Sequence, residues 1–291
     1  MGLALCLSGP SHARAPTPPI TLSMVGETSE PTNLAPDPQF TADVTALIGD
    51  SPLLSKIHAQ DALSVVVVDI TNPKSIKTAM VRPDWETFTA SLSKIIVLLG
   101  TVTEFGGSQR EWRKVKERAE DMIKGSSNEA AISLFKEVGH RRVRDAASAH
   151  GLYDDVRGGI WWVPRSSFPM SPKTGVKICA TSRKVARYFV LMEQGRLNNA
   201  RDSRLIKDVL FNSKLALLHG GVVKAEPGAR YFGKPGVLHE DVSEGMLIEG
   251  ERVRYIVAVI SHGTHYKDPG WLAFGQALHE LIQGRHAGVA P

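Results

Sequence analysis

The chain has 291 residues, 42% of them hydrophobic, so it is long enough to bury a large core, and its length favours one composite domain over two separate ones. Lys and Arg number 35 against 30 Asp and Glu, but the excess of positive charge is spread along the chain and forms no single stripe. This distribution argues against nucleic acid as a partner.

The first 38 residues differ in composition from the rest. Residues 3–9 are apolar, and Ala13-Arg14-Ala15 has the small-x-small pattern of a signal-peptidase site, so residues 1–15 are interpreted as a signal-peptide remnant of a periplasmic or secreted protein. No Lys or Arg precedes the apolar stretch, so either the true start lies upstream or the likeness to a signal is accidental. Residues 16–38 are rich in Pro, Thr, Ser and Glu, which predicts a flexible linker.

A domain over residues 39–286 is predicted from the hydrophobic patterns that follow. The expected helices are 44–57, 95–102, 111–123, 129–138, 182–194 and 271–282, and the expected strands are 64–70, 77–81, 231–237, 241–248 and 255–261. This order predicts an α+β fold of two lobes: an antiparallel sheet flanked by terminal helices (39–90 and 214–286) and an all-helical lobe (91–213). The active site is expected between the lobes. No transmembrane span is expected, because no later apolar run is long enough.

The motif Ser91-Leu92-Ser93-Lys94 follows the predicted hairpin and opens an apolar helix. Residues three apart are neighbours on a helix, so the serine oxygen and the lysine amine share one face. A buried lysine near other cations can lose its proton and act as a base. The alternative is that Ser91 only caps the helix, since serine is a preferred capping residue.

Two weaker motifs follow in the chain. Ser126-Ser127-Asn128 lies in a loop before a predicted helix, where such residues are also ordinary turn and cap composition. Lys234-Pro235-Gly236 lies on a predicted strand, where Gly236 allows a close backbone approach.

Together, in this order, the three motifs resemble S-x-x-K, S-D-N and K-T-G of the serine β-lactamase and penicillin-binding protein superfamily, closest to the class A β-lactamases. The resemblance covers about residues 39–284 and implies their two-lobe fold. It implies that Ser91 attacks a carbonyl, that Lys94 is the base, and that Ser126 passes the proton to the leaving group. Asn128 would hold a substrate carbonyl or Lys94, and Lys234 a substrate carboxylate. The Ser91 and Val237 N–H groups would form the oxyanion hole.

The sequence departs from the family pattern at two places. Pro235 supplies neither the hydroxyl nor the N–H of the usual threonine, so carboxylate recognition must be weaker or different, although the strand survives if Val237 N–H faces the open cleft. No glutamate occurs between His140 and Val176, where class A enzymes carry the residue that activates water for deacylation. Asp154 and Asp155 are interpreted as turn residues.

Two further features have competing interpretations. Trp161 and Trp162 either pack the loop onto the helical lobe, which is favoured, or wall an apolar substrate pocket. His262 and His265 make a poor metal site without nearby cysteines or paired acids, so no metal and no cofactor are expected.

The sequence therefore predicts a monomeric serine hydrolase acting by an acyl-enzyme on β-lactam-like or related amide and ester substrates. A D-alanyl-D-alanine-type peptidase is a close alternative. A third hypothesis is a protein that binds cell-wall peptides or β-lactams without turnover. The expected partner is a small molecule or a peptide like those of peptidoglycan.

Overall fold

A computed structural model describes residues 19–25, 34–164, 175, 177–213 and 217–287. The proposed signal-peptide remnant, residues 1–15, lies outside these ranges. None of the helices within them combines the length and the apolar character that crossing a bilayer requires.

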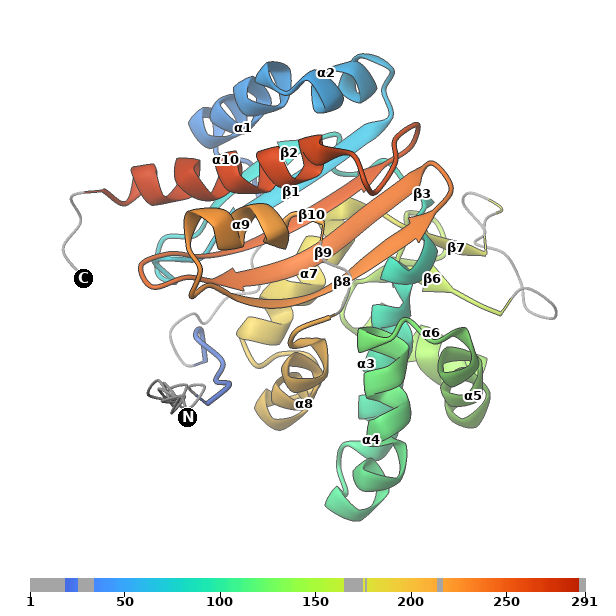
Figure 1. The fold of residues 1–291 in the computed structure, drawn as a ribbon. Coiled ribbons are helices and arrows are strands. Elements are labelled where there is room, and N and C mark those ends of the chain that lie inside the picture. Colours follow the sequence, from blue (N-terminus) through green and yellow to red (C-terminus); the bar gives the residue numbers. More distant parts are fainter. Residues whose placement is uncertain (1–18, 26–33, 165–174, 176, 214–216, 288–291) are drawn as a thin grey trace, which may run out of the picture.

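A five-stranded antiparallel sheet joins the two ends of the chain (Figure 1). Its strand order is β2-β1-β10-β9-β8. The strands are β1 (Leu63–Asp69), β2 (Lys77–Val81), β8 (Arg230–Leu238), β9 (Asp241–Glu249) and β10 (Arg254–Ser261). The predicted hairpin and the predicted three-stranded meander are both confirmed. β1 of the hairpin pairs with β10 of the meander, so strands from both ends of the chain form one sheet.

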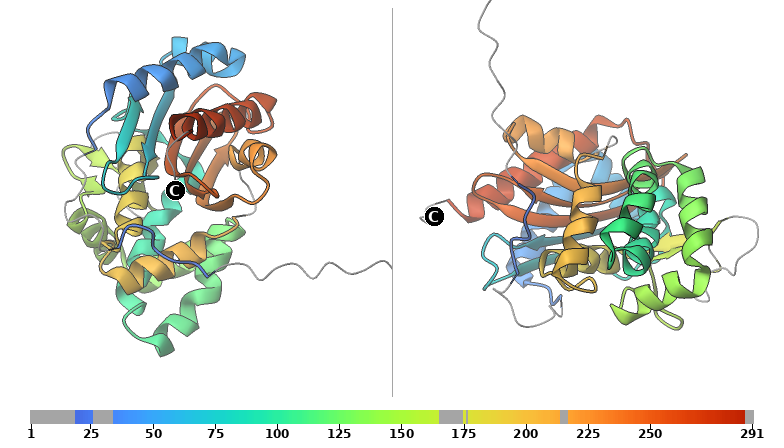
Figure 2. Two further views of the ribbon diagram at one scale, coloured as in Figure 1. Left: turned by 90° about the vertical axis from the view of Figure 1, so that its left-hand side faces the viewer. Right: turned by 90° about the horizontal axis from the view of Figure 1, so that it is seen from below.

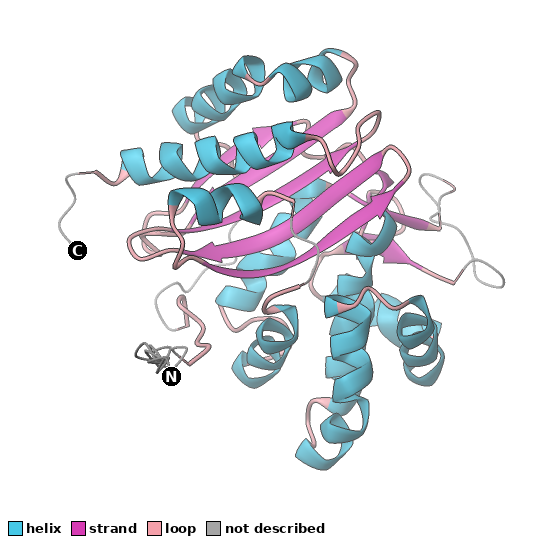
Figure 3. Ribbon diagram, viewed as in Figure 1, coloured by secondary structure: helices cyan, strands magenta, loops and turns pink. Residues whose placement is uncertain are grey.

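Helices from both chain ends cover one face of this sheet (Figure 3). They are α1 (Pro38–Asp50), α2 (Pro52–Ala59), α9 (His219–Ala225) and α10 (Pro269–Arg285). The single helix predicted over 44–57 is two helices, because Ser51 is extended, its side chain accepts from Leu54 N–H, and Pro52 starts the second helix. Alternation in β1 divides the core: Val65 and Val67 face these helices, whereas Val66 and Val68 face the other lobe.

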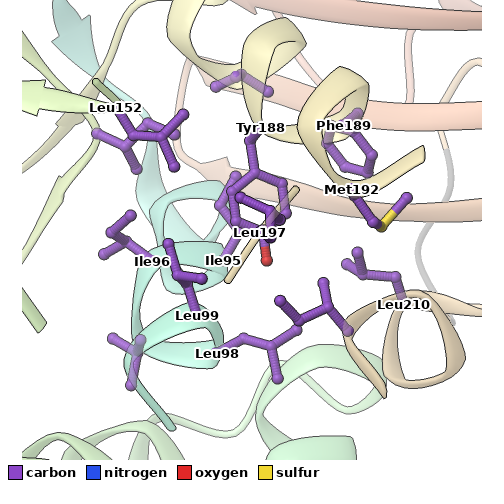
Figure 4. Packing of buried hydrophobic residues seen from close by; sticks show 14 of the residues in the cluster. Ile95, Ile96, Leu98, Leu99, Leu152, Tyr188, Phe189, Met192, Leu197 and Leu210 are labelled. Atoms are coloured by element: carbon purple, nitrogen blue, oxygen red, sulfur yellow. The ribbon is translucent and has the colours of Figure 1, made fainter. Parts of the chain in front are cut away.

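The second lobe lies against the opposite face of the sheet (Figure 2). Its helices are α3 (Lys94–Phe105), α4 (Gln109–Lys124), α5 (Asn128–Val138), α6 (His140–Ala149), α7 (Ser182–Glu193) and α8 (Ala200–Leu210). Residues 94–102 of α3 are all buried, which explains its nearly continuous apolar sequence. Ile95 and Leu99 of α3 pack with Tyr188 and Met192 of α7 at the centre of the lobe (Figure 4).

The prediction of an all-helical lobe is wrong in one respect. Three short strands, β3 (Thr87–Phe88), β6 (Trp161–Trp162) and β7 (Ile178–Ala180), form a small sheet in the order β3-β7-β6. A second pair joins β4 (Tyr153–Asp154) to β5 (Gly158–Gly159). Strands of two or three residues carry too short a pattern to separate from a loop by periodicity.

Residues 19–25 pack against the helical lobe, where the sequence predicts a linker. Met24 is 1% exposed, and the Thr21 carbonyl accepts a 2.6 Å hydrogen bond from Lys207 Nζ. Lys207 is fully buried between Glu193 at 2.7 Å and Glu249 at 2.6 Å. The ordering of residues 19–25 thus depends on a buried charge cluster whose members lie more than 150 residues away in the chain.

Replacement of Lys207 by Met should lower the free energy of unfolding by about 3–5 kcal/mol, because it leaves two buried carboxylates without their shared cation. Urea denaturation measures the change. Lys114→Met is the control, since Lys114 pairs with Glu111 on an exposed surface, and its loss should cost less than about 1 kcal/mol. Equal stability of the two variants would show that the buried cluster contributes no more than a surface pair.

Candidate active site

Ser91 lies on a short 3-10 turn, η1 (Ala90–Ser93), that leads from β3 into α3. Ala90 has a φ of 47°, an uncommon left-handed conformation for a residue with a side chain. Neither η1 nor α3 has a side-chain cap bond at its start, so Ser91 does not serve as the helix cap. Strained backbone conformations cluster at functional sites, and here one lies directly before a serine whose hydroxyl caps no helix.

The turn that carries Ser91 is pressed against the main sheet. A Cβ on Gly236 would come within 2.1 Å of the Thr89 carbonyl and 2.7 Å of the Leu92 nitrogen, so only glycine fits there. Ser243 on β9 donates a 2.8 Å hydrogen bond to the same Thr89 carbonyl. The close approach that the sequence assigns to Gly236 is therefore present, and its partner is the turn of Ser91.

Lys94 is the first residue of α3, one turn after Ser91, and is 1% exposed. Its Nζ donates a 2.6 Å hydrogen bond to the Ser126 carbonyl. Burial lowers the pKa of the Lys94 amine to about 8. The amine therefore exchanges its proton near neutral pH, as a general base must.

Ser126 lies in the loop between α4 and α5, with a φ of 57°. Its hydroxyl accepts a 3.0 Å hydrogen bond from Lys234 Nζ, which also donates to the Pro235 carbonyl at 2.8 Å. Burial, and then the nearby charge of Lys94, lower the pKa of Lys234 to about 7. Lys234 is 1% exposed, so the amine expected to hold a substrate carboxylate lies behind Ser126.

The outer edge of β8 shows how the strand tolerates Pro235. The carbonyls of Tyr231 and Pro235 accept bonds from Asn212 N–H and Lys234 Nζ, so these residues, four apart on the strand, both direct their backbone polar groups away from β9. Val237 is two residues further on, and its backbone groups therefore face the same outer edge. Pro235 removes no bond from the β8–β9 ladder, and Val237 N–H is directed into the cleft.

A pocket of about 360 Å³ opens at Ser91. Among the predicted site residues, it is lined by Ser91, Lys94, Asn128 and Val237. Ser126 and Lys234 join them through the hydrogen bonds given above, and Gly236 through its contact with η1. The structure thus brings all seven predicted residues to one place. Asn128 is the first residue of α5 and is exposed to solvent.

Phe88, Trp162 and Ile178, one from each strand of the small sheet, form a pocket wall, of which the sequence analysis considered only Trp162. Both interpretations hold for Trp162, which packs against Phe135 of α5 and also lines the pocket, and Trp161 packs against Tyr153 and His140 as the favoured interpretation expects. The one available signal was the aromatic and β-branched character of these short segments.

The loop before this wall holds no water-activating carboxylate among the residues described. Asp154 accepts hydrogen bonds from the N–H groups of Val156 and Arg157, as the turn interpretation requires. These N–H groups hold the pKa of Asp154 below its usual range. No acidic side chain is among the described residues that line the pocket.

His262 and His265 lie by a separate hollow at the β8–β9 turn. His262 Nδ1 is 2.9 Å from Asp241 Oδ1. Within the described part of the chain, no group of three His, Cys, Asp or Glu side chains is placed to hold a metal ion.

Comparison with protein families matches residues 100–283, more than half of the chain, to the β-lactamase enzyme family. The match begins after Ser91 and Lys94, so their assignment depends on the geometry described above. A search of curated protein sequences gives no match.

Solved structures of similar fold include PBP-A, with 15% sequence identity and a TM-score of 0.64 over 86% of this chain and 99% of that one. A β-lactamase from Sphaerobacter thermophilus has 15% identity and a TM-score of 0.62, covering 86% and 98% of the two chains. A class A β-lactamase from Mycobacterium abscessus has 16% identity and a TM-score of 0.61, covering 86% and 99%. At these identities the likeness establishes the fold, which is the predicted α+β fold of class A β-lactamases.

Replacement of Lys94 by Met should stabilise the protein near neutral pH. The folded-state pKa lies below that of an unfolded lysine, so the unfolded chain binds more protons between pH 8 and 10 and wild-type stability rises with pH there. At pH 7 the variant should gain up to about 3 kcal/mol over the wild type, less what the lost hydrogen bond contributed, and the gain should fall to about 1 kcal/mol or less at pH 10.

Urea denaturation at pH 7 and pH 10 tests this expectation. Lys136→Met is the control, because Lys136 is exposed and its removal should change stability equally at both pH values. A Lys94→Met effect that is the same at the two pH values would show that burial does not perturb this amine.

Proposed function

Because the chain belongs to the β-lactamase enzyme family, we propose that it is a serine hydrolase that reacts through an acyl-enzyme on Ser91. The observation that carries this proposal is the buried Lys94 amine, whose pKa is lowered to about 8 and which shares one pocket with the Ser91 hydroxyl. An unactivated serine is a weak nucleophile, and a neutral amine in the same pocket supplies the base it needs.

In the first half of the reaction, Ser91 Oγ bonds to the substrate carbonyl carbon while neutral Lys94 takes the serine proton. The N–H groups of Ser91 and Val237 donate to the developing oxyanion, which is most effective in a site that excludes water. Collapse of the intermediate breaks the bond to the leaving group. Ser126, held by Lys234 Nζ at 3.0 Å, delivers the proton that the leaving nitrogen or oxygen requires.

The proposed substrates are β-lactams or related amides and esters. In the second half of the reaction, water must attack the acyl-enzyme with Lys94 as its base, because no carboxylate lies among the described residues that line the pocket. We therefore expect release of the acyl group to be slower than its transfer to Ser91. A D-alanyl-D-alanine-type peptidase uses the same first half of the reaction.

The second candidate function is a binder of cell-wall peptides or β-lactams that acylates without turnover. Pro235 favours it, since the position opposite Glu244 in the ladder offers no donor to a substrate carboxylate. We also propose that the protein is exported to the periplasm or the exterior, on the strength of the N-terminal sequence pattern. That it is a monomer stays a prediction.

Incubation with a fluorescent penicillin should add the mass of one acyl group to the protein. In the hydrolase the added mass decays over time after excess reagent is removed, and in the non-turnover binder it persists. Ser91→Ala should abolish labelling, since the attacking oxygen is gone.

Ser93→Ala is the matched control, because the Ser93 hydroxyl lies in the same turn but is bonded to Thr89 and to the Cys179 carbonyl. It should keep the label if it folds, as judged by circular dichroism. Labelling of Ser91→Ala at the wild-type rate contradicts the proposal.

The acylation rate should rise with pH through about 8. The neutral fraction of Lys94 grows from about one tenth at pH 7 to about one half at pH 8, and only this form accepts the serine proton. Stopped-flow release of p-nitrophenol from an active ester, corrected for hydroxide hydrolysis, measures the profile. A rate that is independent of pH between 6 and 9 would remove Lys94 from the role of base.

A further inference from the structure

The described lining of the Ser91 pocket is mostly apolar. Phe88, Trp162 and Ile178 of the small sheet line it, together with Ile132 of α5. Leu238, at the end of β8, closes the pocket beyond Val237. Apart from the reacting groups Ser91 and Lys94, the only polar residue among the described lining is Asn128.

The two cations of the site are poorly placed to attract an anion. Lys234 is 1% exposed, and its Nζ donates to the Ser126 hydroxyl and to the Pro235 carbonyl. With a pKa of about 7 it is largely neutral at pH 8, and Lys94 is about half neutral at that pH. No other Lys or Arg is among the described lining residues.

The backbone beside these amines offers no replacement donor. Pro235 has no N–H on the outer edge of β8, where a substrate carboxylate next to the scissile bond would lie. Its ladder partner Glu244 is fully buried behind the sheet, bonded to Tyr231 and to the Leu217 and Leu218 N–H groups. A carboxylate in the substrate would therefore find no N–H donor at residue 235.

We infer that this pocket selects uncharged substrates with an apolar acyl group, such as aryl and alkyl esters of hydrophobic acids, over substrates with a carboxylate beside the scissile bond. The inference rests on the proposed acyl-enzyme and names the substrate class of the same site. In the reaction the Ser91 Oγ–carbonyl bond forms, the ester C–O bond breaks, and the serine proton leaves with the alcohol or phenol. The acyl chain would lie against the apolar residues that line the pocket.

Two series of esters test this inference on the full chain at pH 8. In the first, p-nitrophenyl acetate, butanoate, hexanoate and octanoate differ only in acyl length, and kcat/KM for acylation should rise about fourfold per CH2 until the pocket is filled. The second series compares two phenylacetyl esters whose leaving groups differ only in charge. One leaving group is 3-hydroxybenzoate, which carries a carboxylate, and the other is methyl 3-hydroxybenzoate, which is neutral. The neutral compound should acylate Ser91 at least about tenfold faster after correction for their rates with hydroxide.

A pair of isoleucine variants ties the chain-length effect to the pocket. Ile178→Ser should flatten the dependence on acyl length, because it places a hydroxyl in the wall. Ile76→Ser is its control: Ile76 is also partly buried, but it lies in the β1–β2 turn at the end of the sheet opposite the β8–β9 turn. The control should retain the wild-type dependence on chain length.

The possible failures separate the two proposals. Faster acylation by the carboxylate-bearing ester, with no dependence on chain length, overturns the inference about substrate class and leaves the acyl-enzyme intact. No acylation of Ser91 by any ester or by penicillin, in protein that is folded by circular dichroism, overturns the proposed function and this inference with it.

Discussion

The contact between β8 and the turn of Ser91 is the constraint on which the site depends. It exists only because Gly236 has no side chain where a Cβ would overlap the Thr89 carbonyl. On the neighbouring strand, a Cβ on Gly245 would come within 2.4 Å of Val185 on α7. Two glycines on adjacent strands thus let the helical lobe approach the sheet closely enough for one cleft to draw residues from both lobes.

The same closeness excludes water from two amines. Lys94 and Lys234 each donate to a backbone carbonyl, and within the described structure neither forms an ion pair with a carboxylate. Desolvation disfavours the ammonium form of both, and at Lys234 it outweighs the opposing effect of Glu244. The protein therefore maintains bases at near-neutral pH through packing, and the fold carries the energetic cost of burying them.

Much of this arrangement could be predicted from the chain. Long patterns, such as the apolar runs of α3 and β10, predicted their elements well, and the order of the motifs predicted that Ser91, Ser126 and Lys234 lie together. The α6 helix was missed because only Val143, Ala146 and Ala147 mark its buried face. The packing of residues 19–25 was missed because its partners, Lys207 and Glu193, are distant in sequence and look like surface charges.

The small sheet was the most consequential omission, since its strands are too short to produce a period. It is also the element that links the shape of the pocket to the position of the serine. Phe88 precedes the turn of Ser91 by two residues, and Ser93 in that turn donates to the Cys179 carbonyl of β7 at 3.0 Å.

A sequence change in β3 or β7 that reshapes the acyl pocket would consequently also displace the nucleophile. Ile132 on α5 and Leu238 at the end of β8 line the same pocket but are distant from Ser91 in the sequence. Of the lining residues, Ile132 is thus the one whose replacement should change substrate preference with least effect on the reactivity of Ser91.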